Sequence, residues 1–207
     1  MIETVLIIVL LAVTAIVLHE CAHGWVANCL GDPTAKFLGR LTLNPLKHID
    51  LVGTILVPAA LYLIHAFGWT KSLLMFGWAR PVPVNFSRLR NPKRDMMLVA
   101  IAGPLVNFLI AFLLIRLVNL NFLNGTPQDL LIAAVFLNIG LACFNMIPIP
   151  PLDGSRIVMG LLPEELEKVY KSLEPFGIII VIVLLNVGAL DFIDGIIYGV
   201  ASFMGLR

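Results

Sequence analysis

The stretch "IETVLIIVLLAVTAIVLHECAHGWVANCL" at residues 2–30 is an apolar run long enough to cross a lipid bilayer as one helix. Near its C-terminal end it carries His19, Glu20 and His23, which form the pattern HExxH. Ionisable side chains inside a membrane-spanning helix are costly unless they are paired, so they usually mark a functional site. The stretch therefore predicts both a membrane protein and the place of its chemistry.

The composition extends this prediction to the whole chain, because 59% of the residues are hydrophobic, 13% are charged and the mean hydropathy is +0.98. The first apolar window covers residues 2–18 and runs on to about residue 30, and further windows lie at 96–119, 128–147 and 174–190. We expect an all-α polytopic membrane protein with about five to six membrane segments, forming a single integral-membrane domain over residues 1–207. The net charge of +1 gives no reason to expect a nucleic-acid partner.

Two polar segments interrupt the apolar windows, "GDPTAKFLGRLTLNPLKHID" at 31–50 and "GWARPVPVNFSRLRNPKRD" at 77–95. Their Pro, Gly and Asn content predicts turns and short β-like elements. Both carry the basic excess of a cytoplasmic side. A single crossing by the apolar residues between them would place the two basic segments on opposite sides. The pattern therefore favours a re-entrant segment at 51–79, with a short tilted span as the alternative.

The HExxH pattern has a specific chemical meaning on a helix. Residues four apart share a face, so His19 and His23 can donate two nitrogens to one ion while Glu20 lies beside it. Zinc hydrolases use such a set, in which a carboxylate takes a proton from water and returns it to the leaving amine. The alternative is a chance match among packing residues. We predict one Zn²⁺ per chain, with two histidine ligands and Glu20 as the base.

A third protein ligand is expected in "FNMIPIPPLDGSRI" at 144–157, where three prolines interrupt a hydrophobic helix just before Asp153. Non-helical backbone at membrane depth is tolerated only where protein or a water-filled cavity covers it. Asp153 is therefore the favoured ligand, and the alternative is a cap on the next helix. His48 and His65 are weaker candidates, since both lie in segments expected at the membrane interface.

Three motifs in a fixed order give the chain a resemblance: HECAH at 19–23, AGPLVN at 102–107 and NMIPIPPLDG at 145–154. Together they resemble the site-2 protease family of intramembrane zinc metalloproteases, over residues 1 to about 160 and in a minimal form without a recognisable PDZ or CBS domain. The resemblance implies a three-helix catalytic core, with zinc held by His19, His23 and Asp153 and with Glu20 as the base. It also implies an endopeptidase that cleaves in or near transmembrane segments of single-span membrane proteins.

Three asparagines are candidates for contact with the substrate or with a developing oxyanion: Asn145, Asn107 and Asn44. Asn145 and Asn107 belong to the motifs of the resemblance, and Asn138 lies seven residues before Asn145 on the same face. Hydrogen bonding between helices is the alternative for Asn138 and Asn145. For Asn107 and Gly103 the alternative is helix packing, since small residues let helices approach closely. Asn44 could lie on an edge that pairs with an unwound substrate strand, or could form a turn before a proline.

Topology connects the site to one side of the membrane. If the windows at 96–119 and 128–147 cross out and back, His23 and Asp153 can meet only when residues 31 and 95 lie on the same side. An even number of crossings between them is then required, which agrees with a re-entrant segment. We expect a multi-pass protein in the plasma membrane, with the lipid bilayer and single-span proteins as partners and the active site towards the cytoplasm. The sequence leaves the oligomeric state open.

Two other functions compete with hydrolysis. A catalytically silent binding protein could keep the fold, but metal binding alone would not require Glu20. A metal transporter would need polar residues on several helices through the full membrane depth, whereas the ionisable groups here gather near one face. Both comparisons favour the hydrolase.

Overall fold

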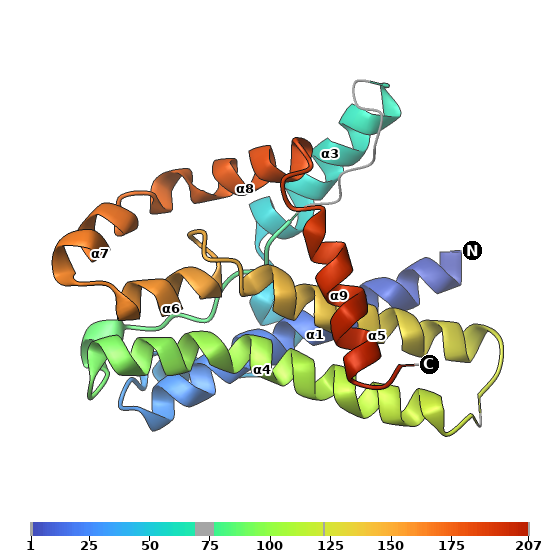
Figure 1. Ribbon diagram of the computed structural model, residues 1–207, viewed down its shortest axis with the longest axis horizontal. Coiled ribbons are helices and arrows are strands. Elements are labelled where there is room, and N and C mark those ends of the chain that lie inside the picture. The colour runs from blue at the N-terminus through green and yellow to red at the C-terminus, as the bar shows by residue number, and fades with distance from the viewer. Residues whose placement is uncertain (1, 69–76, 122, 207) are drawn as a thin grey trace.

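The computed structural model describes residues 2–68, 77–121 and 123–206 (Figure 1). The regular structure of these residues is helical, and they contain no β-strand. In chain order the elements are α1 (Ile2–Cys29), α2 (Thr34–Phe37), η1 (Pro45–His48), η2 (Leu51–Leu56), α3 (Val57–Ala66), η3 (Phe86–Arg88), α4 (Pro92–Asn119), α5 (Thr126–Asn145), α6 (Asp153–Leu161), α7 (Glu164–Lys171), η4 (Glu174–Phe176), α8 (Gly177–Asn186) and α9 (Phe192–Phe203).

Four stretches of helix are long and apolar enough to cross a membrane: Leu6–Cys29, Pro92–Asn119, Thr126–Asn145 and Glu164–Asn186. Two further apolar helices, Leu51–Ala66 and Phe192–Phe203, are shorter. The prediction of an all-helical chain is confirmed, with four helices in the described residues that are long and apolar enough to span a membrane, and the number of five to six membrane segments stays a prediction. The fourth stretch begins earlier than the window predicted at 174–190, because α7 continues into η4 and α8 with little interruption.

The core is built from α1, α4 and α5, which lie side by side, with α4 in contact with both of the others (Figure 1). One cluster of buried side chains joins α1 and α4 to α6 and includes Ala27, Val99 and Met159. A second cluster joins α4 and α5 to α9 and includes Ile115 and Ile139. In this three-helix arrangement α1 and α4 are in direct contact, so side chains of one helix can bond to residues of the other.

The β-like elements expected at 31–50 and 77–95 are not formed in the part of the chain that the structure describes. Instead, the side chains of Asp32, Asn44 and Asn85 each accept a hydrogen bond from the backbone N–H two residues further on. Such local bonds compete with strand pairing, and the prolines of these segments have no N–H to offer. The two segments are therefore turns and short helices connected by individual hydrogen bonds.

The two ends of the predicted re-entrant segment lie together. The backbone N–H of Trp78 donates to the carbonyl of Gly53 at 3.1 Å, and the N–H of Arg80 donates to the carbonyl of His48 at 2.8 Å. Between these contacts, η2 and α3 project away from the helical core (Figure 1). Residues 69–76 of the predicted segment lie outside the described residues. The chain thus leaves the core and comes back to the same place.

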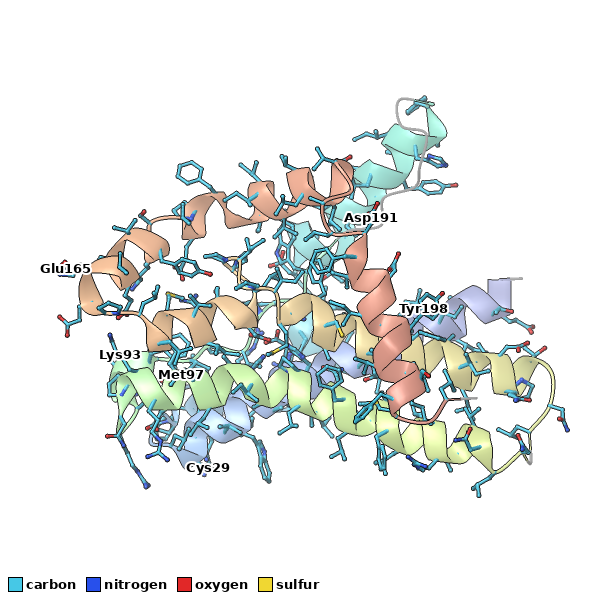
Figure 2. All side chains as sticks on the ribbon, in the orientation of Figure 1. Cys29, Lys93, Met97, Glu165, Asp191 and Tyr198 are labelled. Carbon is cyan, nitrogen blue, oxygen red and sulfur yellow. The ribbon has the colours of Figure 1, made fainter. Side chains whose placement is uncertain are left out.

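Helix α6 begins beside the end of α5 and runs along α4. A Cβ on Gly154 would lie 2.2 Å from the carbonyl oxygen of Met146, so the first turn of α6 rests directly on the chain that leaves α5. A Cβ on Gly160 would lie 2.3 Å from the Cγ of Met97 on α4. Figure 2 shows Met97 and Lys93 on α4, facing α6. These close contacts fix the position of Asp153.

Candidate metal centre

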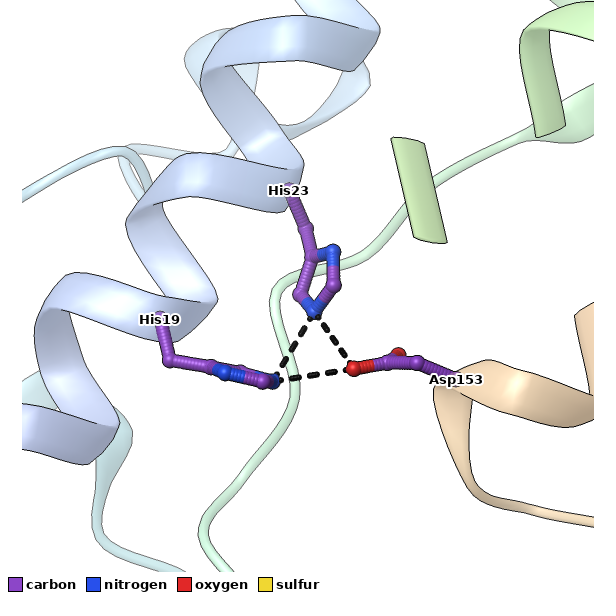
Figure 3. Close-up of side chains that lie close together, drawn as sticks. All are labelled: His19, His23 and Asp153. Carbon is purple, nitrogen blue, oxygen red and sulfur yellow. Dashed lines mark hydrogen bonds and ion pairs between the residues drawn. The ribbon is translucent and has the colours of Figure 1, made fainter. Parts of the chain in front are cut away.

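Three side chains from two separate helices converge at one point (Figure 3). The Nε2 atoms of His19 and His23, one turn apart on α1, lie 3.1 Å from each other. The Oδ2 of Asp153, at the start of α6, lies 3.0 Å from Nε2 of His19 and 3.2 Å from Nε2 of His23. Both histidines are buried. The structure therefore brings together the three residues that the sequence proposed as ligands.

Asp153 does not cap α6, since the N-cap residue is Leu152, which makes no side-chain capping hydrogen bond. The Oδ2 of Asp153 is buried and faces the two imidazoles.

The outer nitrogen of each imidazole is bonded to the opposite helix. Nδ1 of His23 lies 2.7 Å from the carbonyl oxygen of Val99 on α4. Because a carbonyl only accepts, a neutral His23 carries its proton on Nδ1 and has a lone pair on Nε2. That lone pair points towards Asp153, as metal ligation requires.

The proton of His19 is placed by a chain of two asparagines. Nδ2 of Asn138 donates to the carbonyl of Ala134 at 2.8 Å, so its Oδ1 is an acceptor. That Oδ1 accepts from Nδ2 of Asn107 at 2.9 Å. The Oδ1 of Asn107 then accepts from Nδ1 of His19 at 2.6 Å. A neutral His19 therefore also has its lone pair on Nε2.

The residues fit a bound zinc ion. Two nitrogen lone pairs and one carboxylate oxygen at 3.0–3.2 Å from one another repel unless a cation lies between them. Ligands bound at 2.0–2.1 Å in a tetrahedral zinc site are about 3.3 Å apart, close to the spacing found here. Two imidazoles and a carboxylate are also a donor set that zinc accepts readily.

Gly103 on α4 forms one wall of this centre. A Cβ at this position would lie 2.4 Å from Nε2 of His23 and 2.6 Å from Cε1 of His19. The sequence suggested helix packing for Gly103, and the structure shows that what packs here is the pair of imidazoles. A glycine inside an apolar helix was the one available signal, and it did not reveal the partner.

Glu20 follows His19 on α1, and its carboxylate is not among the side chains whose ligand atoms converge, which are those of His19, His23 and Asp153. Its side chain is half-buried, and its Oε2 accepts a 2.8 Å hydrogen bond from the backbone N–H of Val82. This contact brings the segment between α3 and η3 against α1. It is an interaction that sequence analysis did not foresee, because a backbone amide has no signature of its own.

The asparagine candidates separate into three situations. Asn107 is 0% exposed and joined to His19, so its contacts are within the protein rather than with a substrate. The Nδ2 of Asn145 donates to the carbonyl of Leu141 within α5. The exposed Asn44 caps η1, which is the turn before a proline that the sequence allowed.

An apolar groove of about 560 Å³ adjoins the HExxH turn of α1. It lies between α1, α4 and the residues before Asn44. Its lining includes Cys21, Ala22, Trp25, Leu41, Leu105 and Leu109. Cys21 and Ala22 occupy the two variable positions of HExxH, so the groove runs along the same turn of α1 as the candidate centre, although none of His19, Glu20, His23 and Asp153 lines it.

Comparison with known proteins gives a consistent result. A profile of peptidase family M50 matches residues 115–187. A Bacillus subtilis protein named "Putative zinc metalloprotease YwhC" is 38% identical over 187 residues, which cover 86% of this chain and 78% of that protein. "Zinc metalloprotease MJ0392" of Methanocaldococcus jannaschii is 26% identical over 159 residues, covering 77% of this chain and 35% of that protein. No solved structure matches the chain significantly.

Proposed function

Since the chain belongs to peptidase family M50, whose members are membrane proteases, we propose that it is a zinc-dependent endopeptidase that cleaves other membrane proteins in or near their transmembrane segments. The observation that carries this proposal is the meeting of three lone-pair atoms, two from His19 and His23 on the apolar helix α1 and one from Asp153 on α6, with Glu20 next to His19 in the chain. Such a set of ionisable groups in a membrane-spanning helix is costly without a function.

In the proposed site, His19, His23 and Asp153 hold one zinc ion per chain. When bound, zinc lowers the pKa of a water molecule and polarises the peptide carbonyl. Glu20 accepts the proton that the attacking water loses and transfers it to the leaving amine, so the base is regenerated in each turnover. Asn107 and Val99 keep the two imidazoles in the tautomer that ligation needs.

The proposed substrates are apolar segments of single-span membrane proteins. The groove beside the HExxH turn is lined mainly by hydrophobic side chains and includes Cys21 and Ala22, the two variable residues of that motif. A helix hides its backbone amides, so a substrate helix has to unwind locally before a peptide bond reaches the base. Helix-breaking residues near the scissile bond should therefore favour cleavage.

The proposed location is the plasma membrane, with the site towards the cytoplasm. Residues 77–95 carry five basic side chains, Arg80, Arg88, Arg90, Lys93 and Arg94, against one acidic residue, the buried Asp95. This excess supports a cytoplasmic position under the positive-inside rule. The contacts of Trp78 and Arg80 with residues before α3 support a re-entrant path that keeps residues 31–50 on the same side.

The test uses purified protein in lipid vesicles together with a panel of single-span membrane proteins. The wild type should contain about one zinc per chain and should cleave at least one member of the panel. Glu20→Gln should abolish cleavage and retain the zinc, because Glu20 is not among the converging atoms. A wild-type protein that binds zinc but cleaves no member of a broad panel would contradict the proposal, as would full activity in Glu20→Gln.

A further inference from the structure

A short proline-flanked segment lies over the candidate base. Val82 stands between Pro81 and Pro83, and since proline has no N–H, Val82 supplies the backbone donor of this tripeptide. That donor is directed at Oε2 of Glu20, 2.8 Å away. The contact uses one oxygen of the carboxylate and leaves Oε1 to receive a proton.

The same peptide plane is held at its other end by Arg40. Nη2 of Arg40 donates to the carbonyl of Pro81 at 3.3 Å and to the carbonyl of Arg80 at 3.0 Å. The carbonyl of Pro81 and the N–H of Val82 belong to one planar peptide unit, so fixing the oxygen also fixes the direction of the N–H. A cationic donor on the carbonyl also polarises the unit and strengthens its N–H as a donor.

Close packing supports this geometry. Val82 is 6% exposed, and a Cβ on Gly24 would lie 2.7 Å from its Cγ1. Gly24 follows Glu20 by four residues and therefore lies on the same face of α1, one turn further on. The absence of a side chain at Gly24 lets the segment rest on the helix at the level of Glu20.

We propose that Arg40 is a positioning residue for the reaction: through the Pro81–Val82 peptide plane it holds the carboxylate of Glu20 in one orientation. A side chain of Glu has several rotamers, and only some of them place Oε1 for proton transfer. Restricting the choice raises the fraction of enzyme that is ready to react. This inference rests on the proposed function, because it assigns Glu20 the role of base.

A kinetic test compares Arg40→Gln, Arg40→Lys and wild type in the same vesicles. Arg40→Gln should lower kcat about tenfold or more, with KM and zinc content unchanged, because misplacing a catalytic group costs rate rather than binding. Arg40→Lys should recover part of kcat, since an ammonium can donate to one of the two carbonyls. Arg88→Gln is the matched control, because the Arg88 side chain is exposed and makes no hydrogen bond or ion pair with the other described residues.

Two kinetic outcomes would overturn the proposal. An unchanged kcat in Arg40→Gln would show that the base does not depend on Arg40. A loss of zinc, or a fall in activity equal to that of the Arg88→Gln control, would assign Arg40 a general structural or charge effect.

A second test needs no substrate and therefore separates this inference from the proposed function. In a peptide covering residues 81–84, only Val82 and Val84 have exchangeable amide hydrogens. Hydrogen exchange should show a protected Val82 amide in wild type and in Glu20→Gln, which keeps an acceptor oxygen. Protection should be lost in Glu20→Ala and in Arg40→Gln. Val82 protection that persists in Arg40→Gln would overturn the inference even if cleavage by the wild type is demonstrated.

Discussion

Asn107 on α4 accepts a 2.6 Å hydrogen bond from Nδ1 of His19 on α1. The same amide donates to Asn138 on α5, so one buried side chain connects all three helices of the core at the level of the candidate metal centre. The direction of every bond in this chain is set by the carbonyl of Ala134, which can only accept. The asparagine of the GPLVN motif therefore determines which nitrogen of His19 is free to bind a metal.

Replacing Asn107 by Leu should weaken zinc binding. Loss of such an outer partner of a ligating histidine typically costs 10–100-fold in metal affinity, and we expect a change of about that size. Asn107→Asp should retain more affinity, because a carboxylate still accepts from Nδ1 of His19. The zinc dissociation constant, measured by competition with a chelator, checks both variants.

The matched control is Asn119→Leu at the other end of α4, where the amide bonds the carbonyl of Gly205. This variant should bind zinc like the wild type. Equal affinities in Asn107→Leu and Asn119→Leu would show that the tautomer of His19 does not depend on Asn107.

Gly103→Ala should prevent zinc binding, because the new methyl group would occupy space that the two imidazoles now fill. The new Cβ would lie 2.4 Å from Nε2 of His23, so the imidazole would have to leave its position. We expect loss of zinc and of cleavage with helical content retained, measured by metal analysis and circular dichroism. Gly140→Ala on α5 is the control, since its Cβ would meet Ile197 at an ordinary 3.7 Å. Normal zinc content in Gly103→Ala would show that the two imidazoles can bind zinc beside a side chain at position 103.

The sequence was sufficient to predict the helical membrane fold and the three converging residues. Helical periodicity alone brings His19 and His23 to one face, and the proline-rich break before Asp153 marks where an irregular chain has to be covered. Neither inference needs the arrangement of the other helices. For this reason both features could be predicted from the sequence alone.

The hydrogen-bond partners of Asn107 and Glu20 could not be predicted from the sequence. Which helix faces the amide of Asn107 depends on how α4 is rotated against α1, and sequence spacing within α4 carries no information on that rotation. The bond from Val82 to Glu20 involves a backbone N–H, which is the same in every residue except proline. The β-like elements expected at 31–50 and 77–95 are not formed in the described residues, because side chains such as Asp32 and Asn85 accept hydrogen bonds from the nearby backbone.

Asp153→Ala should weaken zinc binding more than any outer-partner variant, because it removes an anionic ligand from the centre. We expect a loss of more than about 100-fold, beyond the range for outer partners. Asp153→Asn keeps an oxygen and should retain part of the affinity. Asp129→Ala, at the far end of α5, serves as the control. Full zinc occupancy in Asp153→Ala would remove Asp153 from the ligand set.

Gly154→Ala tests whether the place of α6 matters as much as its aspartate. A Cβ would lie 2.2 Å from the carbonyl oxygen of Met146, so the first turn of α6 would have to shift away from α5. Zinc affinity should fall although all three ligands remain. An unchanged dissociation constant would show that Asp153 can follow the metal when its helix moves.

The contact between Arg90 and Leu30 leads to a prediction on topology. The backbone N–H of Arg90 donates to the carbonyl of Leu30 at 3.1 Å, which places the start of α4 beside the end of α1. Lys36 on α2 and Arg90 are both exposed. We expect cysteines introduced singly at these positions, in a background without Cys21, Cys29 and Cys143, to lie in one compartment.

An impermeant thiol reagent, applied to intact and to opened cells, measures that compartment. Because basic segments stay on the cytoplasmic side, Lys36→Cys and Arg90→Cys should react only after the cells are opened. Asn124→Cys, in the exposed turn between α4 and α5, should react in intact cells, since the whole of α4 separates it from Arg90. If Lys36→Cys and Arg90→Cys reacted from opposite sides, the chain between them would cross the bilayer an odd number of times. The hydrogen bonds of Trp78 and Arg80 to the start of that segment could then not form, and Asp153 could not reach His19 and His23 from the same side.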